Sequence, residues 1–425
     1  MHAQGKTWRP ISTGHLFIYF LKWLGLSLVV GGLAGSASAF FLWSLDVVTV
    51  FREGHLWLVW LLPLGGLLIG LTYHYWGEDV VKGNNQLLEE FYSPKKVIPL
   101  RMAPLVLWGT LATHLFGGSA GREGTAVQMG GAIADQFTRI FKLRPRDRRV
   151  LLSMGVSAGF ASVFGTPLAG AVFALEVFVV GKVRYDGILP AFLSAFVAHW
   201  ACHAWGIGHT VYTIPLVPDL QPIHLLLAAL AGIVFGLTAR SFSFLAHYWV
   251  LFFKRLVRWA PLRPVVGGLV LALAFWALGD SRYMGLGIPV IQESFVLEVP
   301  YYDFALKLLL TTFTLGAGFK GGEVTPLFFV GATLGNVLAL FVPLPMALLA
   351  GMGFVAVFAG ATNTPLACIF MGIELFGVES GVFIALAVVM AYLFSGHTGI
   401  YGSQLIGSPK HLLLGRERGR ALHDL

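Results

Sequence analysis

The chain carries the stretch Gly121-Arg122-Glu123-Gly124-Thr125, and a second copy, Gly321-Gly322-Glu323-Val324-Thr325, follows 200 residues later. Each copy places a glutamate in a glycine-rich break between apolar runs. A neighbouring block also repeats: shifted by 198, Gly155 to Phe178 matches Gly353 to Phe376 at ten of 24 positions, where composition alone gives roughly two. Two related halves, each with an interrupted helix that carries an ionisable group, are typical of membrane transporters whose site lies between the repeats.

Composition places the chain in a membrane. The sequence is 56% hydrophobic and 12% charged, whereas soluble domains are about 25% charged. The segment 324–373 has no Asp, Glu, Lys, Arg or His over 50 residues, and one spanning helix needs about 20. The 52 glycines predict many short or interrupted helices, which a membrane tolerates where the backbone is buried or lines a cavity. We predict apolar spans near residues 17–50, 56–76, 99–118, 125–142, 150–180, 186–207, 222–253, 264–280, 303–318, 324–344, 346–376 and 381–396.

The net charge of +8 is gathered in a few clusters. Lys6 and Arg9 precede the first span, and further clusters lie at Arg139 to Arg149, Lys254 to Arg263 and Lys410 to Arg420. Such clusters mark the cytoplasmic side of a membrane protein. The sequence therefore predicts cytoplasmic termini and topological charge, with no nucleic-acid partner.

Four segments are predicted. Residues 1–14 form a cytoplasmic N-terminal segment, 15–210 the first membrane repeat, and 220–405 the second. Residues 406–425 form a cytoplasmic tail that is too short for a regulatory domain.

Glu123 is the first candidate functional residue. It follows a glycine run and precedes a helix-forming stretch, so it is predicted to lie at a helix N-terminus with the backbone N–H groups of Arg122, Gly124 and Thr125. Unpaired donors and the helix dipole favour an anion there. In a soluble protein an ordinary first-turn acid is the better interpretation, but a carboxylate between apolar spans is costly and by default functional. A carboxylate that fills an anion site when charged, and leaves it when protonated, forms a proton-coupled gate.

Glu323 holds the equivalent position in the second half and precedes Thr325-Pro326. Proline suits the first turn of a helix, so a second helix N-terminus is expected to point at the centre. The alternative is a salt bridge between Glu323 and Lys320.

For three other ionisable residues, the sequence either leaves the role open or favours a structural role. Glu176 and Glu374 end apolar runs and could be either capping partners or functional groups. His114 is better explained as a hydrogen-bonded structural residue than as a proton relay. No His-Glu-x-x-His motif or Cys/His cluster at ligand spacing occurs, so neither a metal site nor a cofactor is predicted.

Nearly the whole chain resembles the CLC family of chloride channels and anion/proton exchangers. The resemblance rests on Gly118-x-x-Gly121-Arg122-Glu123-Gly124, Val127-Gln128, Thr364-Pro365-Leu366-Ala367 and the late Tyr401, in that order. It implies an all-α membrane protein with an inverted repeat of two halves and many short, tilted and broken helices. It also implies a homodimer with one ion pathway in each subunit.

The same resemblance implies roles for individual residues. Glu123 corresponds to the gating glutamate, and the Tyr401 hydroxyl and the amides of Glu323 and Val324 correspond to the central anion site. The chloride exchangers' internal Glu-Glu pair reads Glu176-Val177 here. The resemblance therefore does not imply the familiar internal proton route, and Glu323 is the substitute acceptor.

Three departures resemble the fluoride/proton antiporter branch, CLC-F. Chloride-handling members have Gly-Ser-Gly-Ile-Pro where this chain has Gly83-Asn84-Asn85-Gln86-Leu87. They usually have proline at the position of Thr125, and an apolar residue at that of Glu323, which Thr325 follows. Fluoride is small and strongly hydrated, so a selective site must replace its water shell with good donors.

The sequence therefore predicts a fluoride/proton antiporter, not an enzyme, in the cell inner membrane, with fluoride, protons and the lipid bilayer as partners. Glu123 is the gating, proton-coupled residue and Glu323 transfers protons. The predicted anion-binding residues are Asn84, Arg122, Gly124, Val324, Thr325 and Tyr401. A CLC chloride or nitrate transporter and a passive fluoride channel are the alternatives. An intramembrane enzyme is disfavoured because neither glutamate has a partnered nucleophile or metal motif.

Overall fold

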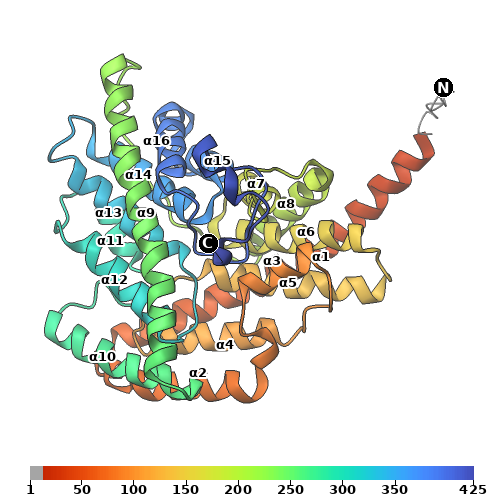
Figure 1. Ribbon diagram of the computed structural model, residues 1–425, viewed down its shortest axis with the longest axis horizontal. Coiled ribbons are helices and arrows are strands. Elements are labelled where there is room, and N and C mark those ends of the chain that lie inside the picture. The colour runs from red at the N-terminus through yellow and green to blue at the C-terminus, as the bar shows by residue number, and fades with distance from the viewer. Residues whose placement is uncertain (1–12) are drawn as a thin grey trace.

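The computed structural model describes residues 13–425, and its regular structure is almost entirely helical (Figure 1). The helices are α1 (Thr13–Glu53), α2 (Leu62–Trp76), α3 (Asn84–Tyr92), α4 (Met102–Leu115), α5 (Glu123–Ile140), α6 (Pro145–Phe164), α7 (Pro167–Glu176), α8 (Ile188–Ala204), α9 (Pro222–Leu256), α10 (Arg263–Leu278), α11 (Ile288–Glu293), α12 (Asp303–Gly316), α13 (Val324–Leu338), α14 (Met346–Thr362), α15 (Pro365–Phe376) and α16 (Gly381–Phe394). Strand β1 (Val179–Val180) pairs in parallel with β2 (Leu405–Ile406). Lys6 and Arg9 lie outside the described residues.

Five helical stretches are long and apolar enough to cross a membrane, the longest of them being α1 and α9. Both extend past the body of the molecule in Figure 1. Their outer faces expose large apolar side chains, among them Phe40, Trp43, Leu226 and Phe244, as lipid contact requires. The predicted fold class, an all-α membrane protein with many short and broken helices, is confirmed. The division at residues 210–220 stays a prediction; the segment 205–221 between α8 and α9 holds no helix or strand.

Two of the predicted spans were wrong in continuity, because a break divides each of them. The spans at 150–180 and 346–376 are each two helices, α6 with α7 and α14 with α15. The breaks occur at left-handed residues, Gly165 (φ 74°) and Asn363 (φ 61°), and each is followed by a helix that starts with proline. A left-handed residue ends a helix, and proline can begin the next but cannot continue the first.

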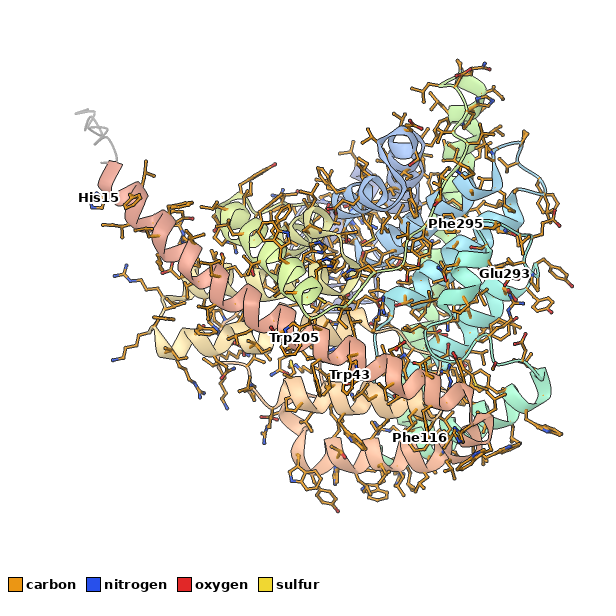
Figure 2. All side chains as sticks on the ribbon, turned by 180° about the vertical axis from the view of Figure 1, so that it is seen from behind. His15, Trp43, Phe116, Trp205, Glu293 and Phe295 are labelled. Atoms are coloured by element: carbon orange, nitrogen blue, oxygen red, sulfur yellow. The ribbon has the colours of Figure 1, made fainter. Side chains whose placement is uncertain are left out.

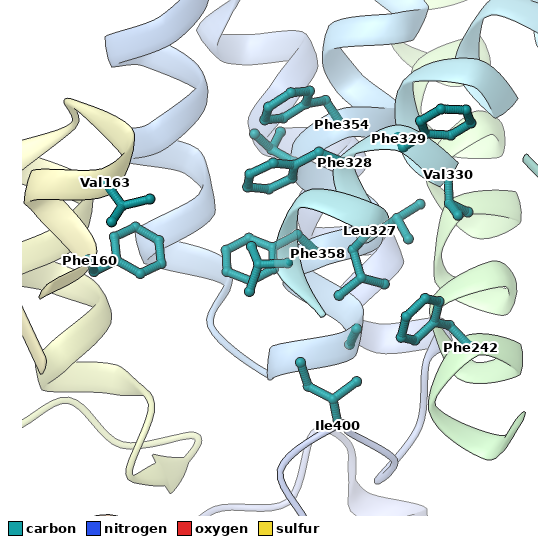
Figure 3. Close-up of a cluster of buried hydrophobic side chains, with 14 of the residues drawn as sticks. Phe160, Val163, Phe242, Leu327, Phe328, Phe329, Val330, Phe354, Phe358 and Ile400 are labelled. Atoms are coloured by element: carbon teal, nitrogen blue, oxygen red, sulfur yellow. The ribbon is translucent and has the colours of Figure 1, made fainter. Parts of the chain in front are cut away.

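The two repeats meet in an aromatic core (Figure 3). Phe160 of α6 and Phe358 of α14 are equivalent residues of the repeats, and their nearly parallel rings lie 6.2 Å apart. Phe328 of α13 stacks on Phe354 of α14 at 4.0 Å. All four side chains are buried. Equivalent phenylalanines therefore contact each other across the boundary between the halves.

Close helix packing fixes the two helices that matter most for the site. A methyl group on Gly331 of α13 would lie 2.0 Å from the carbonyl oxygen of Gly353 in α14, and one on Gly130 of α5 would lie 2.3 Å from that of Gly155 in α6. Only glycine permits such backbone contact. Helices α5 and α13 are held in equivalent ways, so their N-termini have fixed positions.

The periphery of the first repeat is held by α1 and α8. Trp205, directly after α8, lies beside α1 in the rear view (Figure 2), and its indole N–H donates to Ser36 Oγ at 3.0 Å. This hydrogen bond links the end of α8 to the long helix α1 on the outside of the bundle.

Candidate functional site

The two glycine-rich loops predicted to carry the chemistry contact each other directly. Gly121 N–H donates to Gly322 O at 2.6 Å, and Gly322 N–H donates to Gly121 O at 2.8 Å, which makes an isolated antiparallel bridge. Residues 201 positions apart are thus joined immediately before α5 and α13. The N-termini of the two helices therefore meet at one point, as the sequence predicts.

The carboxylate of Glu123 sits on donors of the opposite repeat. Its Oε2 accepts the N–H of Thr325 at 3.0 Å, and its Oε1 accepts the Thr325 hydroxyl. Oε2 also accepts Arg122 N–H at 3.2 Å, and the Arg122 Nε lies 3.7 Å from Oε1. The side chain is 1% exposed. A negatively charged group from the first half therefore occupies the N-terminal donors of α13.

Glu323, the equivalent residue, is held much less firmly. It directly precedes α13, and its Oε2 is buried and has no hydrogen-bond partner among the described residues. The alternative of a salt bridge to Lys320 is not formed: within residues 13–425 no ion pair joins them, and Lys320 Nζ lies 4.1 Å from the centre of the Tyr73 ring. Glu323 thus has a carboxyl oxygen available for another partner.

Other predicted residues converge beside these glutamates. A methyl group on Gly124 would lie 3.0 Å from the Asn84 side-chain nitrogen and 3.7 Å from Glu323 Oε2, so the Asn84 amide approaches the α5 backbone. Asn84, Glu323 and Tyr401 line one cavity of about 1730 Å³. Among the described residues, Gly124 N–H and Val324 N–H make no hydrogen bond. The site therefore has backbone N–H groups without partners, and a cavity lined by Asn84, Glu323 and Tyr401 lies next to it.

Comparison with known proteins assigns the chain to a family. The family described as "Voltage gated chloride channel" matches residues 65–396, which is most of the chain. The chain belongs to the CLC family. It is therefore an integral, multi-pass membrane protein of a transporter class with no catalytic activity indicated.

Relatives of this CLC chain differ in the anion that their names give. A "Chloride/fluoride channel protein" from Pseudomonas syringae pv. tomato is 54% identical over 417 residues, which cover 97% of this chain and 92% of the relative. The crystal structure of a CLC-type fluoride/proton antiporter superposes with a TM-score of 0.88 at 39% identity, covering 93% of this chain and 99% of that one. A slow cyanobacterial Cl⁻/H⁺ antiporter has a TM-score of 0.76 at 20% identity, covering 88% and 94%, and shows the shared fold.

Thr125, one of the departures from the chloride-handling pattern, has a structural partner in this CLC protein. Its hydroxyl lies 2.7 Å from that of Thr110 in α4, and both side chains are buried. The hydroxyl pair joins α4 to the first turn of α5. Sequence reasoning missed Thr110, because nothing in its local pattern marks it.

The loop that carries Tyr401 is tied to α3, and this contact was also missed. The N–H of Ser403 donates to Asn85 Oδ1 at 3.0 Å, and the Ser403 hydroxyl donates to Glu89 Oε1 at 3.1 Å. Asn84 and Tyr401 are therefore held on opposite sides of one short link. The second asparagine of the Asn84-Asn85 pair is the signal that could have pointed to it.

Glu176 and Glu374, whose role the sequence left open, cap each other's helices. Glu176 accepts the N–H groups of Leu366 and Ala367 at the start of α15, at 3.2 and 3.0 Å. Glu374 accepts those of Leu168 and Ala169 at the start of α7, at 2.9 and 2.8 Å. Each helix starts with a proline that has no N–H, and each glutamate takes the next two donors. The geometry is that of capping partners.

His114 matches the structural interpretation. It is buried, and its two ring nitrogens lie 2.9 and 3.1 Å from the carbonyl oxygens of Thr110 and Ala120. It therefore fixes the turn between α4 and the Gly121 loop.

Proposed function

We propose that this CLC protein is a fluoride/proton antiporter of the cell inner membrane, exporting fluoride from the cytoplasm in exchange for inward protons. The observation that carries the proposal is the seat of the Glu123 carboxylate on the N–H and hydroxyl of Thr325. A transported anion would accept hydrogen bonds from those donors. Glu123 and fluoride then compete for one place, and the charge of the gate opposes simultaneous occupancy.

Protonation provides the coupling. A charged carboxylate accepts stronger hydrogen bonds than a neutral acid does, so a proton on Glu123 weakens its hold on Thr325 and lets fluoride take the donors. Glu123 passes its proton towards Glu323, whose unpartnered Oε2 is open to receive it. The inward proton gradient then drives fluoride outward.

Selection of fluoride is assigned to the uncharged donors of the site. The Asn84 amide, the Tyr401 hydroxyl and the N–H groups of Gly124 and Val324 provide dipoles for a small anion that gives up its water shell. Arg122 contributes through its backbone N–H, which supports Glu123. The fluoride/proton antiporter named above, at 39% identity and a TM-score of 0.88, supports fluoride as the anion.

The assembly is also part of the proposal. By family resemblance the protein works as a homodimer in the bilayer, with the repeats 15–210 and 220–405 forming one pathway in each subunit. Under this topology the cytoplasmic side carries Lys6 and Arg9 of the segment 1–14 and the basic residues of the tail 406–425.

Efflux from liposomes tests the proposal. Vesicles that contain only the purified protein and lipid are loaded with fluoride or chloride, and external pH is recorded with the anion electrode. Fluoride efflux that drives protons inward, with little chloride efflux, is the expected result. Comparable chloride efflux would show that the protein is a chloride transporter. Chloride is also named in the description of the Pseudomonas relative. Fluoride efflux without proton movement would identify a passive channel.

A further inference from the structure

The ammonium group of Lys320 is an unpaired cation close to the transport site. The residue lies in the loop before Glu323, and its backbone N–H donates to Thr113 Oγ1 at 3.2 Å. Its Nζ makes no hydrogen bond or ion pair with any residue in 13–425, and it lies over the ring of Tyr73, 4.1 Å from the ring centre. An ammonium group has three N–H donors, so these donors face a ligand or water.

The position of this side chain is built by two helices. Its stem lies against Gly109 of α4, where an added methyl group would come within 2.9 Å of Lys320 Cβ and Cγ. Its head rests on Tyr73 of α2, a residue only 8% exposed. Glycine provides the space, and the ring stabilises the charge without using an N–H donor. The lysine is therefore held in place while its donors stay free.

Lys320 faces the cavity that leads to the predicted anion site. The same cavity is lined by Asn84, Glu323 and Tyr401. Four further basic residues line this cavity, namely Lys82, Arg240, Lys254 and Arg263, but only one further acidic residue, Glu78. Of these, Lys82 is paired with Glu89 at 2.7 Å. A concave surface with an excess of one charge concentrates the opposite ion.

We propose that Lys320 Nζ is a capture site for a small inorganic anion, from which the anion passes to Asn84 and Tyr401. The anion is fluoride if the proposed function holds, on which this inference rests. Lys320 lines the cavity, and no described residue accepts a hydrogen bond from its Nζ, so these N–H groups can bind an anion there. Asn84 and Tyr401 line the same cavity, so the anion can pass on to their donors, as transport through successive sites requires.

The test compares Lys320→Met with its matched controls in fluoride-loaded liposomes. Met keeps an unbranched apolar stem and loses the charge, so the fluoride concentration for half-maximal efflux should rise about tenfold or more, while the ratio of fluoride to protons stays the same. Lys320→Arg should restore most of the loss. Tyr73→Phe keeps the ring and should behave as wild type. Lys22→Met removes a cation that is paired with Asp147 away from this cavity and should change nothing.

Three outcomes would overturn the inference. An unchanged half-maximal concentration in folded Lys320→Met protein removes the capture site. A changed fluoride-to-proton ratio at constant half-maximal concentration assigns Lys320 to the protonation of Glu323 instead. Titration of the detergent-solubilised protein with sodium fluoride and sodium chloride separates this inference from the proposed function. If the wild type binds an anion more tightly than Lys320→Met does, the capture site stands even where no exchange occurs; equal affinities refute it.

Discussion

The chain has two pairs of repeat-related glutamates, and their carboxyl groups have different hydrogen-bond partners in the structure. In the pair Glu176 and Glu374, each carboxylate accepts two backbone N–H groups at the start of the helix that carries the other glutamate. In the pair Glu123 and Glu323, one carboxylate has taken donors from the opposite repeat, and the other has an oxygen without a partner. The first pair keeps the symmetry of the repeat and the second breaks it.

Under the proposed function, this difference separates structural carboxylates from those that take part in transport. Both Glu176 and Glu374 have their hydrogen bonds satisfied at the same time, so neither gains by moving. Glu123 has hydrogen-bond donors and Oε2 of Glu323 has none among the described residues, and a buried unpartnered carboxyl oxygen is costly. A site with two occupants and donors for one has two arrangements, which alternation between anion and proton requires.

Removing the acidity of Glu323 should have the largest effect. Glu323→Gln keeps the shape but cannot exchange a proton, so turnover of coupled exchange should fall to the background of protein-free liposomes. The fold should survive, because Oε2 of Glu323 makes no hydrogen bond that would be lost. Coupled flux and gel filtration of the same preparation provide the measurement, with Glu323→Asp as the acidic control. Fully coupled exchange in Glu323→Gln would exclude this residue from the proton path.

Neutralising Glu123 should abolish coupling while anion movement continues. In Glu123→Gln the side chain no longer carries the charge that competes for Thr325, so fluoride should pass without driving protons. The measurement is the pH change per fluoride released, which should fall to zero. Proton pumping at the wild-type ratio in this variant would show that another group is the gate.

Asn84 should affect selection of the anion and leave coupling intact. Asn84→Ser replaces the amide donor that reaches Gly124 with a shorter hydroxyl, and the loss of one hydrogen bond to fluoride should reduce the preference for fluoride over chloride by about tenfold. Efflux of the two anions under matched gradients measures it. Unchanged selectivity would mean that residues other than Asn84 select the anion. Asn84→Ala, which removes the polar side chain altogether, would check that result.

Much of this organisation was readable from the sequence because it is local or repeated. The offset of 200 residues aligned Glu123 with Glu323, and the glycine runs before them predicted two helix N-termini at the centre. Apolar run length gave the helical membrane class. These features depend on composition and spacing, which do not need knowledge of distant contacts.

The remaining features depend on contacts between distant segments. The breaks at Gly165 and Asn363 were hidden because the apolar runs continue across them, and only the following Thr-Pro pairs marked them. Side-chain geometry across the two repeats decides which donors Glu123 binds. It also decides that Lys320 lies against Tyr73 and forms no ion pair with Glu323. Spacing alone cannot show whether Glu176 and Glu374, which end apolar runs, cap a helix or take part in transport.

The symmetric pair yields the smallest expected effect on transport. Glu176→Gln and Glu374→Gln each replace a carboxylate that accepts two N–H groups with an amide that can accept at only one atom, so each should lower the free energy of unfolding by about 1–3 kcal/mol. The fluoride-to-proton ratio should stay at the wild-type value, because neither carboxylate borders the Asn84 cavity. The two glutamates lie at opposite ends of the α7 and α15 pair, so their effects on stability should add in the double variant. Thermal unfolding in detergent, followed by tryptophan fluorescence, and flux from the same preparation measure both quantities. A variant with wild-type stability but an altered ratio would move Glu176 or Glu374 into the proton path and remove the distinction between the two pairs.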